Sequence, residues 1–207
     1  MQKYLNNLRA RAIFGLCVIG VFVITSQLFI FALVIQQTSS SRVVNLAGRQ
    51  RMLSQQLTKN ALILRHSTDT STRSASLDEL SDTLQSWERV HQGLQDGNRD
   101  LGLPDSNSVS VSNLFDLIET DYQQILTSSS CILVLEGYLD DSDLGCNNNL
   151  DFYLQLILSH EQAFLIGMDA IVFQYDTEAQ NSIRQIQRFG NSLALFYLAG
   201  IIYPDCC

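Results

Sequence analysis

Hydrophobic residues follow two different patterns along this chain, one continuous and one periodic. Residues 12–35 form a continuous apolar run in which Thr25, Ser26 and Gln27 are the clearly polar members. At about 1.5 Å per residue, a helix over this run is about 36 Å long, enough to cross a hydrocarbon core of about 30 Å. The alternative is a cleaved signal peptide, whose apolar stretch usually has about 7 to 15 residues. We therefore expect an uncleaved membrane helix.

Beyond this run, apolar residues recur at helical spacing and predict a bundle. Strand signals are absent, and the two prolines, Pro104 and Pro204, interrupt no long periodic segment. The sequence predicts an all-α fold, a membrane-anchored antiparallel four-helix bundle with an N-terminal transmembrane helix. The second helix is expected to open with a capping box formed by Ser76 and Glu79. The expected helices cover about Ser40 to His66, Ser76 to Gln95, Val111 to Glu136 and Leu150 to Arg188.

A second apolar stretch follows near the end of the sequence. It runs from Phe189 to Tyr203, before Pro204, and is shorter than the roughly 20 residues of a spanning helix. We expect the first half of a return span, truncated; the alternative is a buried terminal helix of the bundle. The predicted organisation is a cytoplasmic tail (1–11), a transmembrane helix (12–36), an extracytoplasmic bundle (37–189) and a truncated second transmembrane segment (190–207).

Charge is distributed unevenly and indicates the orientation in the membrane. The formal net charge is −8, yet the first acidic residue is Asp69 and eight of the thirteen Lys and Arg residues precede it. Lys3, Arg9 and Arg11 precede the apolar run, and residues 36–41 carry no charge, so the N-terminus is expected in the cytoplasm. The bundle then lies in the periplasm and the anchor in the inner membrane. The acidic balance argues against a nucleic-acid partner.

The remaining chemistry-bearing residues predict neither a metal site nor a cofactor. Cys131 and Cys146 lie on the outer side, where a disulfide can form, and two free thiols remain the alternative. The acidic loop 137–149 lacks the alternate ligand spacing of a calcium-binding EF-hand, which favours a solvated loop. The three histidines stand on three different predicted helices without ligand spacing, and no catalytic constellation is present, so we expect no enzyme.

The first bundle helix carries two stripes on a helical wheel. One stripe faces the core (Leu46, Gln50, Leu53, Leu57, Ala61, Leu64) and the other is largely small or polar (Val44, Ala47, Gly48, Arg51, Gln55, Thr58, Leu62). Small residues let a second helix approach closely, so we expect a homodimer interface at Val44, Ala47, Gly48 and Thr58. Two copies of Arg51 would then face each other beside Gly48 and Gln55, forming a cleft for a small planar anion. The alternative is that Arg49 and Arg51 are solvated residues on an exposed face.

Three separated motifs resemble those of a known family. Residues 45–57 (NLAGRQRMLSQQL) closely resemble a conserved box of the N-terminal domain of type IV pilus methyl-accepting chemotaxis transducers (PilJ type), which is related to the sensor domain of nitrate/nitrite sensor kinases (NarX type). Trp87, His91, Leu94 and Gly97, followed by residues 101–104 (LGLP), fit the same family. The third motif is residues 164–175, with Phe164, Met168, Asp169 and Tyr175.

This resemblance implies a sensory function. Such proteins are two-span receptors with a periplasmic four-helix bundle, usually dimeric, that feeds a kinase, chemotaxis or cyclase module. In nitrate sensors the arginine three positions after Ala-Gly binds the anion at the dimer interface, and it aligns with Arg51. Arg49 and Gln50 depart from the nitrate sensors and match the pilus-type branch, which leaves the ligand open.

The expected function is therefore that of a membrane-anchored input domain without its own output domain, with nitrate or nitrite as a possible ligand at Arg51. No phospho-acceptor motif or nucleotide-binding glycine cluster occurs in the sequence. One alternative is a membrane-anchored interaction protein that pairs with full-length related receptors. Another is a non-functional remnant of an interrupted receptor gene.

Overall fold

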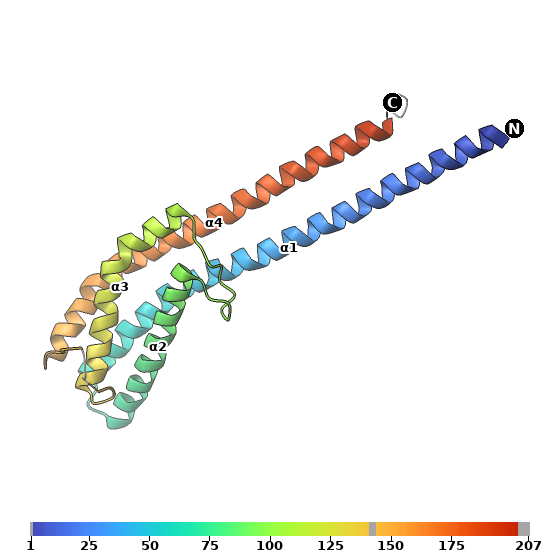
Figure 1. The fold of residues 1–207 in the computed structure, drawn as a ribbon. Coiled ribbons are helices and arrows are strands. Elements are labelled where there is room, and N and C mark those ends of the chain that lie inside the picture. Colours follow the sequence, from blue (N-terminus) through green and yellow to red (C-terminus); the bar gives the residue numbers. More distant parts are fainter. Residues whose placement is uncertain (1, 141–143, 203–207) are drawn as a thin grey trace. The chain divides into compact units, whose positions relative to one another are not determined.

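The computed structural model describes residues 2–140 and 144–202, and this part of the chain is helical (Figure 1). It contains four helices: α1 (Gln2–His66), α2 (Thr70–Asp96), α3 (Val109–Leu135) and α4 (Leu150–Ile202). Within the described residues, extended pairing is limited to an isolated bridge between Asn98 and Leu103. The predicted all-α fold is confirmed. The expectations for residues 141–143 of the acidic loop, and for Pro204, Cys206 and Cys207, fall outside the described residues.

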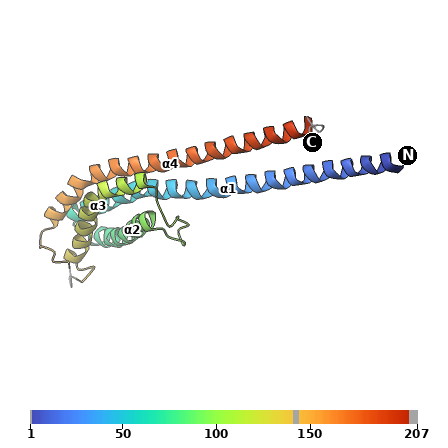
Figure 2. The same cartoon turned by 45° about the horizontal axis from the view of Figure 1, so that its top comes forward.

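The chain divides into two units, and the larger, Ser39–Thr177, is the helical bundle. In it α2 and α3 lie beside the bundle portions of α1 and α4 (Figures 1 and 2). All four helices contribute fully buried side chains to one hydrophobic core, because each has an apolar stripe at helical spacing. The largest of these side chains are Trp87 of α2, Phe115 of α3 and Phe164 of α4, together with Leu57 and Leu64 of α1.

α2 begins earlier than the sequence pattern indicated. Asp69 is its N-cap, and the Asp69 carboxylate accepts a hydrogen bond from the Thr72 backbone N–H at 2.9 Å. The hydroxyls of Ser71 and Thr72 donate to the same carboxylate. The expected cap Ser76 is buried inside the helix instead. Aspartate is a preferred N-cap residue, and here it starts the helix at Thr70, so the start predicted at Ser76 is wrong.

The connection between α2 and α3 is a structured turn that contacts two other helices. Gly97 ends α2 with φ of 87°, and a Cβ there would lie 2.5 Å from the Asp105 Cα, so only glycine fits. The Asn107 amide donates to the Leu94 carbonyl at 2.7 Å and accepts from the Tyr175 hydroxyl of α4 at 2.7 Å. The turn thereby fixes α4 to the end of α2.

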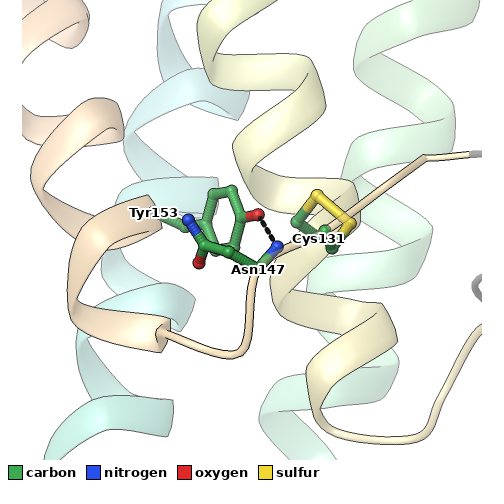
Figure 3. Close-up of a disulfide and its surroundings, with 4 residues drawn as sticks. Cys131, Asn147 and Tyr153 are labelled. Carbon is green, nitrogen blue, oxygen red and sulfur yellow. Dashed lines mark hydrogen bonds between the residues drawn. A yellow bond between two sulfur atoms is a disulfide. The ribbon is translucent and has the colours of Figure 1, made fainter.

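A disulfide joins the end of α3 to the connection that leads into α4. Cys131 is buried on α3 and is bonded to Cys146, fifteen residues further along the chain (Figure 3). Beside it, the Asn147 backbone N–H donates to the Tyr153 hydroxyl at 2.6 Å (Figure 3). The disulfide and this hydrogen bond hold the start of α4 against the end of α3.

The second unit consists of the terminal segments, Met1–Thr38 and Glu178–Cys207. Its part of α1 includes the stretch Gly15–Ala32, which is long and apolar enough to cross a membrane, and its large apolar side chains are exposed. This stretch is the candidate membrane span. A second candidate stretch lies in α4 within Leu150–Ser192, but part of it belongs to the bundle core. Gly190 of α4 lies against the Phe29 ring of α1, where an added Cβ would come within 2.9 Å.

Candidate functional site

The surface of α1 in the bundle carries the residues that the sequence singled out for binding. Arg51 and Gln55 are exposed, and Gly48 is half-buried. A Cβ added to Gly48 would meet nothing within 4 Å, so this position is open to the outside of the bundle. Because residues three, four and seven apart share one side of a helix, Gly48, Arg51 and Gln55 form one exposed surface. We call these three residues the α1 face.

Two residues of the expected dimer interface do not belong to this face. Ala47 is 0% exposed and Thr58 is 6% exposed within the single chain. The Thr58 hydroxyl donates to the Ser54 carbonyl at 3.2 Å, inside its own helix. In the single chain Ala47 packs in the core and Thr58 is covered, and their place in an interface between two copies stays a prediction. Val44 is half-buried.

The exposed surface of α1 is therefore rotated slightly from the one expected. Its exposed members beside Gly48 and Gln55 include Asn45, Met52 and Lys59. These residues recur every three or four positions, which describes a continuous stripe along one side of the helix. Met52 is 52% exposed and adds an apolar side chain to this stripe. The sequence motif contained Met52, but the wheel analysis did not assign it to a partner-facing surface.

Arg51 has a carboxylate partner in its own chain. Its Nη1 lies 2.6 Å from Oδ1 of Asp169 on α4, and the two side chains are 44% and 55% exposed. The pair connects α1 with α4 at the surface of the bundle. Asp169 lies in the third sequence motif, but it is more than a hundred positions from Arg51 in the sequence, and their contact depends on how α1 and α4 pack. Sequence reasoning assigned it no role.

Two further cations of α1, Lys59 and Arg65, also bind neighbouring helices. Lys59 lies 3.6 Å from Glu79 of α2. Arg65 binds Asp151 of α4 through two nitrogens, Nε and Nη2. At the opposite end of the bundle portion of α1, the Arg42 guanidinium lies against Gly102 of the α2–α3 connection.

A layer of polar and aromatic side chains lies inside the bundle near Arg51. The Gln50 amide donates to the Trp87 carbonyl at 3.1 Å, which links α1 to α2. His91 of α2 is fully buried and stacks on Tyr122 of α3, with ring centroids 3.6 Å apart and planes within 9°. Burial lowers the pKa of His91 to about 3 and raises the pKa of Tyr122. The histidine therefore stays neutral at physiological pH.

The three histidines that the structure describes lie on three different helices of the bundle. Among the residues that the structure describes, no group of three or more His, Cys, Asp or Glu side chains is placed to hold a metal ion. His91 is in the core, His66 is exposed, and His160 pairs with Asp121 at 2.7 Å. At the described surface of the bundle, acidic side chains instead form separate ion pairs with basic side chains of other helices.

A family model matches a large part of the chain. It is described as the N-terminal region of type IV pili methyl-accepting chemotaxis transducers (PilJ) and matches residues 32–138, just over half of the sequence. The matched region includes all of α2 and α3 and the bundle portion of α1, with the α1 face. No curated protein and no solved structure gives a significant match to the chain.

Proposed function

The chain belongs to the family of N-terminal domains of type IV pili methyl-accepting chemotaxis transducers, a sensory and non-catalytic family. From this premise we propose that it is the extracytoplasmic input domain of a two-span receptor. In this proposal residues 1–11 are cytoplasmic, residues 12–36 cross the inner membrane and residues 37–189 form the periplasmic sensor domain. Residues 190–207 belong to the second transmembrane segment.

The basic residues before the first span support this orientation. Lys3, Arg9 and Arg11 precede the apolar stretch Gly15–Ala32, and positive residues stay on the cytoplasmic side of a membrane. A disulfide between Cys131 and Cys146 suits an oxidising compartment such as the periplasm. The orientation is tested with a reporter protein whose activity depends on its compartment, fused either before or after residues 12–36. A periplasmic reading for a fusion at the N-terminus would contradict the orientation.

We further propose that two copies pair through the α1 face and bind a small planar anion, such as nitrate or nitrite, at Arg51. The observation that carries this proposal is the combination of an exposed guanidinium with an open glycine one turn before it and an exposed amide one turn after it. Guanidinium groups bind planar oxyanions through paired N–H donors. Gly48 allows a partner helix to approach, and the exposed Met52 supplies apolar contact area.

Calorimetry tests the anion site. Nitrate and nitrite are titrated into the full chain in detergent at constant ionic strength, for the wild type and for Arg51→Ala. We expect heat of binding in the wild type and none in the variant. Arg49→Ala is the matched control, because Arg49 is an exposed arginine two positions away on the same helix. Equal binding by wild type and Arg51→Ala would remove Arg51 from the site.

The pairing is tested by Gly48→Leu. Because a Cβ at Gly48 meets nothing within 4 Å in the single chain, the variant is expected to fold normally and to lose the dimer. Light scattering with detergent correction measures the mass, and thermal unfolding checks the fold. A Gly48→Leu protein that remains dimeric would place the interface elsewhere.

A further inference from the structure

The structure assigns Asp169 a role in the proposed anion site: it is the internal counterion of Arg51, and an anion must displace it to bind. The inference rests on the proposed binding of an anion at Arg51 and specifies how that site is regulated. Occupancy of the site and the ion pair between α1 and α4 then exclude each other. The ligand thereby releases a link between the two helices.

The geometry of the pair supports such an exchange. Asp169 Oδ1 lies 2.6 Å from Arg51 Nη1, close enough to occupy the position that an oxygen of a bound anion would take. A carboxylate is itself a planar oxyanion, so it offers Arg51 the same kind of contact as nitrate. Both side chains are about half exposed. An exposed ion pair of this kind contributes little free energy, so a ligand can replace it.

A second ion pair between the same two helices has a different geometry. Arg65 binds both carboxylate oxygens of Asp151, through Nε and Nη2, at the far end of α1 in the bundle and at the start of α4. The disulfide between Cys131 and Cys146 also holds the beginning of α4. The start of α4 is thus fixed independently of Arg51. Loss of the Arg51 pair would remove the link between α1 and α4 at Asp169 while the beginning of α4 remains attached.

Thermodynamic linkage gives the expected effect of removing the competitor. If Asp169 and the anion compete for Arg51, the apparent affinity for the anion is the intrinsic affinity multiplied by the fraction of protein in which the ion pair is open. Asp169→Asn removes the charge and keeps the side-chain shape. From the strength of exposed ion pairs, we expect anion affinity to rise about two- to fivefold.

Asp151→Asn is the matched control. It removes one carboxylate from the same helix and breaks an ion pair with the same partner helix. Arg65 is fourteen positions from Arg51, about 21 Å along a helix, beyond the screening length of about 8 Å at physiological ionic strength. The control therefore changes the net charge and the number of α1–α4 links equally, without affecting the electrostatics at Arg51.

The experiment is calorimetric titration of nitrate and of nitrite into the full chain in detergent, for the wild type, Asp169→Asn, Asp151→Asn and Arg51→Ala. Tighter binding by Asp169→Asn, unchanged binding by Asp151→Asn and none by Arg51→Ala would support the inference. If Asp169→Asn binds like the wild type while Arg51→Ala loses binding, Asp169 is no competitor, although the anion site stands. An equal gain in both Asn variants would indicate a general charge effect and overturn the inference. Absence of binding in all four proteins would overturn both proposals.

Discussion

Acidification should destabilise this protein through one buried histidine. His91 is fully buried on α2, where it stacks on Tyr122 and contacts Phe115 edge-on, with ring centroids 5.4 Å apart. Both of its ring nitrogens are buried without a hydrogen-bond partner in the described residues. A protonated imidazole would carry a charge into this aromatic surrounding with no acceptor for its second proton. Burial therefore lowers the pKa of His91 to about 3.

The sign and size of the effect follow from linkage. The unfolded chain binds a proton at His91 near pH 6.5, whereas the folded chain does so only near pH 3. The contribution of His91 to stability is therefore complete above about pH 6.5 and is lost as the pH falls toward 3. A shift of this size corresponds to about 5 kcal/mol over the whole window, of which about 3 kcal/mol is lost by pH 4.5.

Denaturant unfolding at pH 7.5 and pH 4.5 measures this loss. Trp87 is the single tryptophan of the sequence, and its ring centroid lies 6.2 Å from that of His91, so its fluorescence reports unfolding at this position. The control is His91→Leu, which cannot titrate and removes the two unpaired imidazole nitrogens from the core. Carboxylates titrate in both proteins, so their contribution cancels in the comparison. We expect the wild type to lose about 3 kcal/mol more than the variant between the two pH values. Equal losses would refute the reasoning.

Three further predictions have defined outcomes. Gly167→Ala should destabilise the bundle by about 1–3 kcal/mol, because its Cβ would lie 1.9 Å from a methyl group on α3. Gly48→Ala should stabilise the bundle by about 0.5–1 kcal/mol, because a Cβ there meets nothing within 4 Å. Thermal unfolding compares the two variants. Replacing Cys131 and Cys146 together by serine should cost about 3 kcal/mol, seen as a lower denaturant midpoint that reductant does not lower further. Asp69→Ala should weaken the protection of backbone amides from hydrogen exchange in the first turn of α2. Three hydrogen bonds lower the pKa of Asp69 to about 2, so in the wild type the same protection should decrease as the pH falls from about 4 toward 2.

The helices were predictable because each carries a long periodic apolar stripe. The predicted starts of the third and fourth helices lie within two residues of Val109 and Leu150, where α3 and α4 begin. The start of α2 was missed because two good caps precede the same apolar stripe. The capping box at Ser76 is a local signal, but Asp69 binds three donors and adds six residues to the helix.

The site was less predictable because it depends on the exact rotation of α1. A wheel locates the centre of a buried stripe, but the residues at its margins are decided by how closely neighbouring helices approach. Ala47 and Thr58 lie at such margins and are covered within the chain. Gly48 and Gln55, close to them on the wheel, remain accessible. The pairing of Arg51 with Asp169 requires the alignment of α1 and α4 along their axes, which no local pattern specifies.

The separation of charge along the sequence has a structural meaning in the bundle. The first acidic residue is Asp69, which follows the end of α1, so this helix cannot form ion pairs with carboxylates of its own. Three of its cations bind carboxylates of other helices instead: Lys59 binds Glu79 of α2, and Arg51 and Arg65 bind α4. Such exposed pairs add little stability, but each favours one alignment of two helices. In the proposal made above, a ligand that competes with Asp169 for Arg51 would therefore shift the relation between α1 and α4 at small energetic cost, as a sensory domain requires.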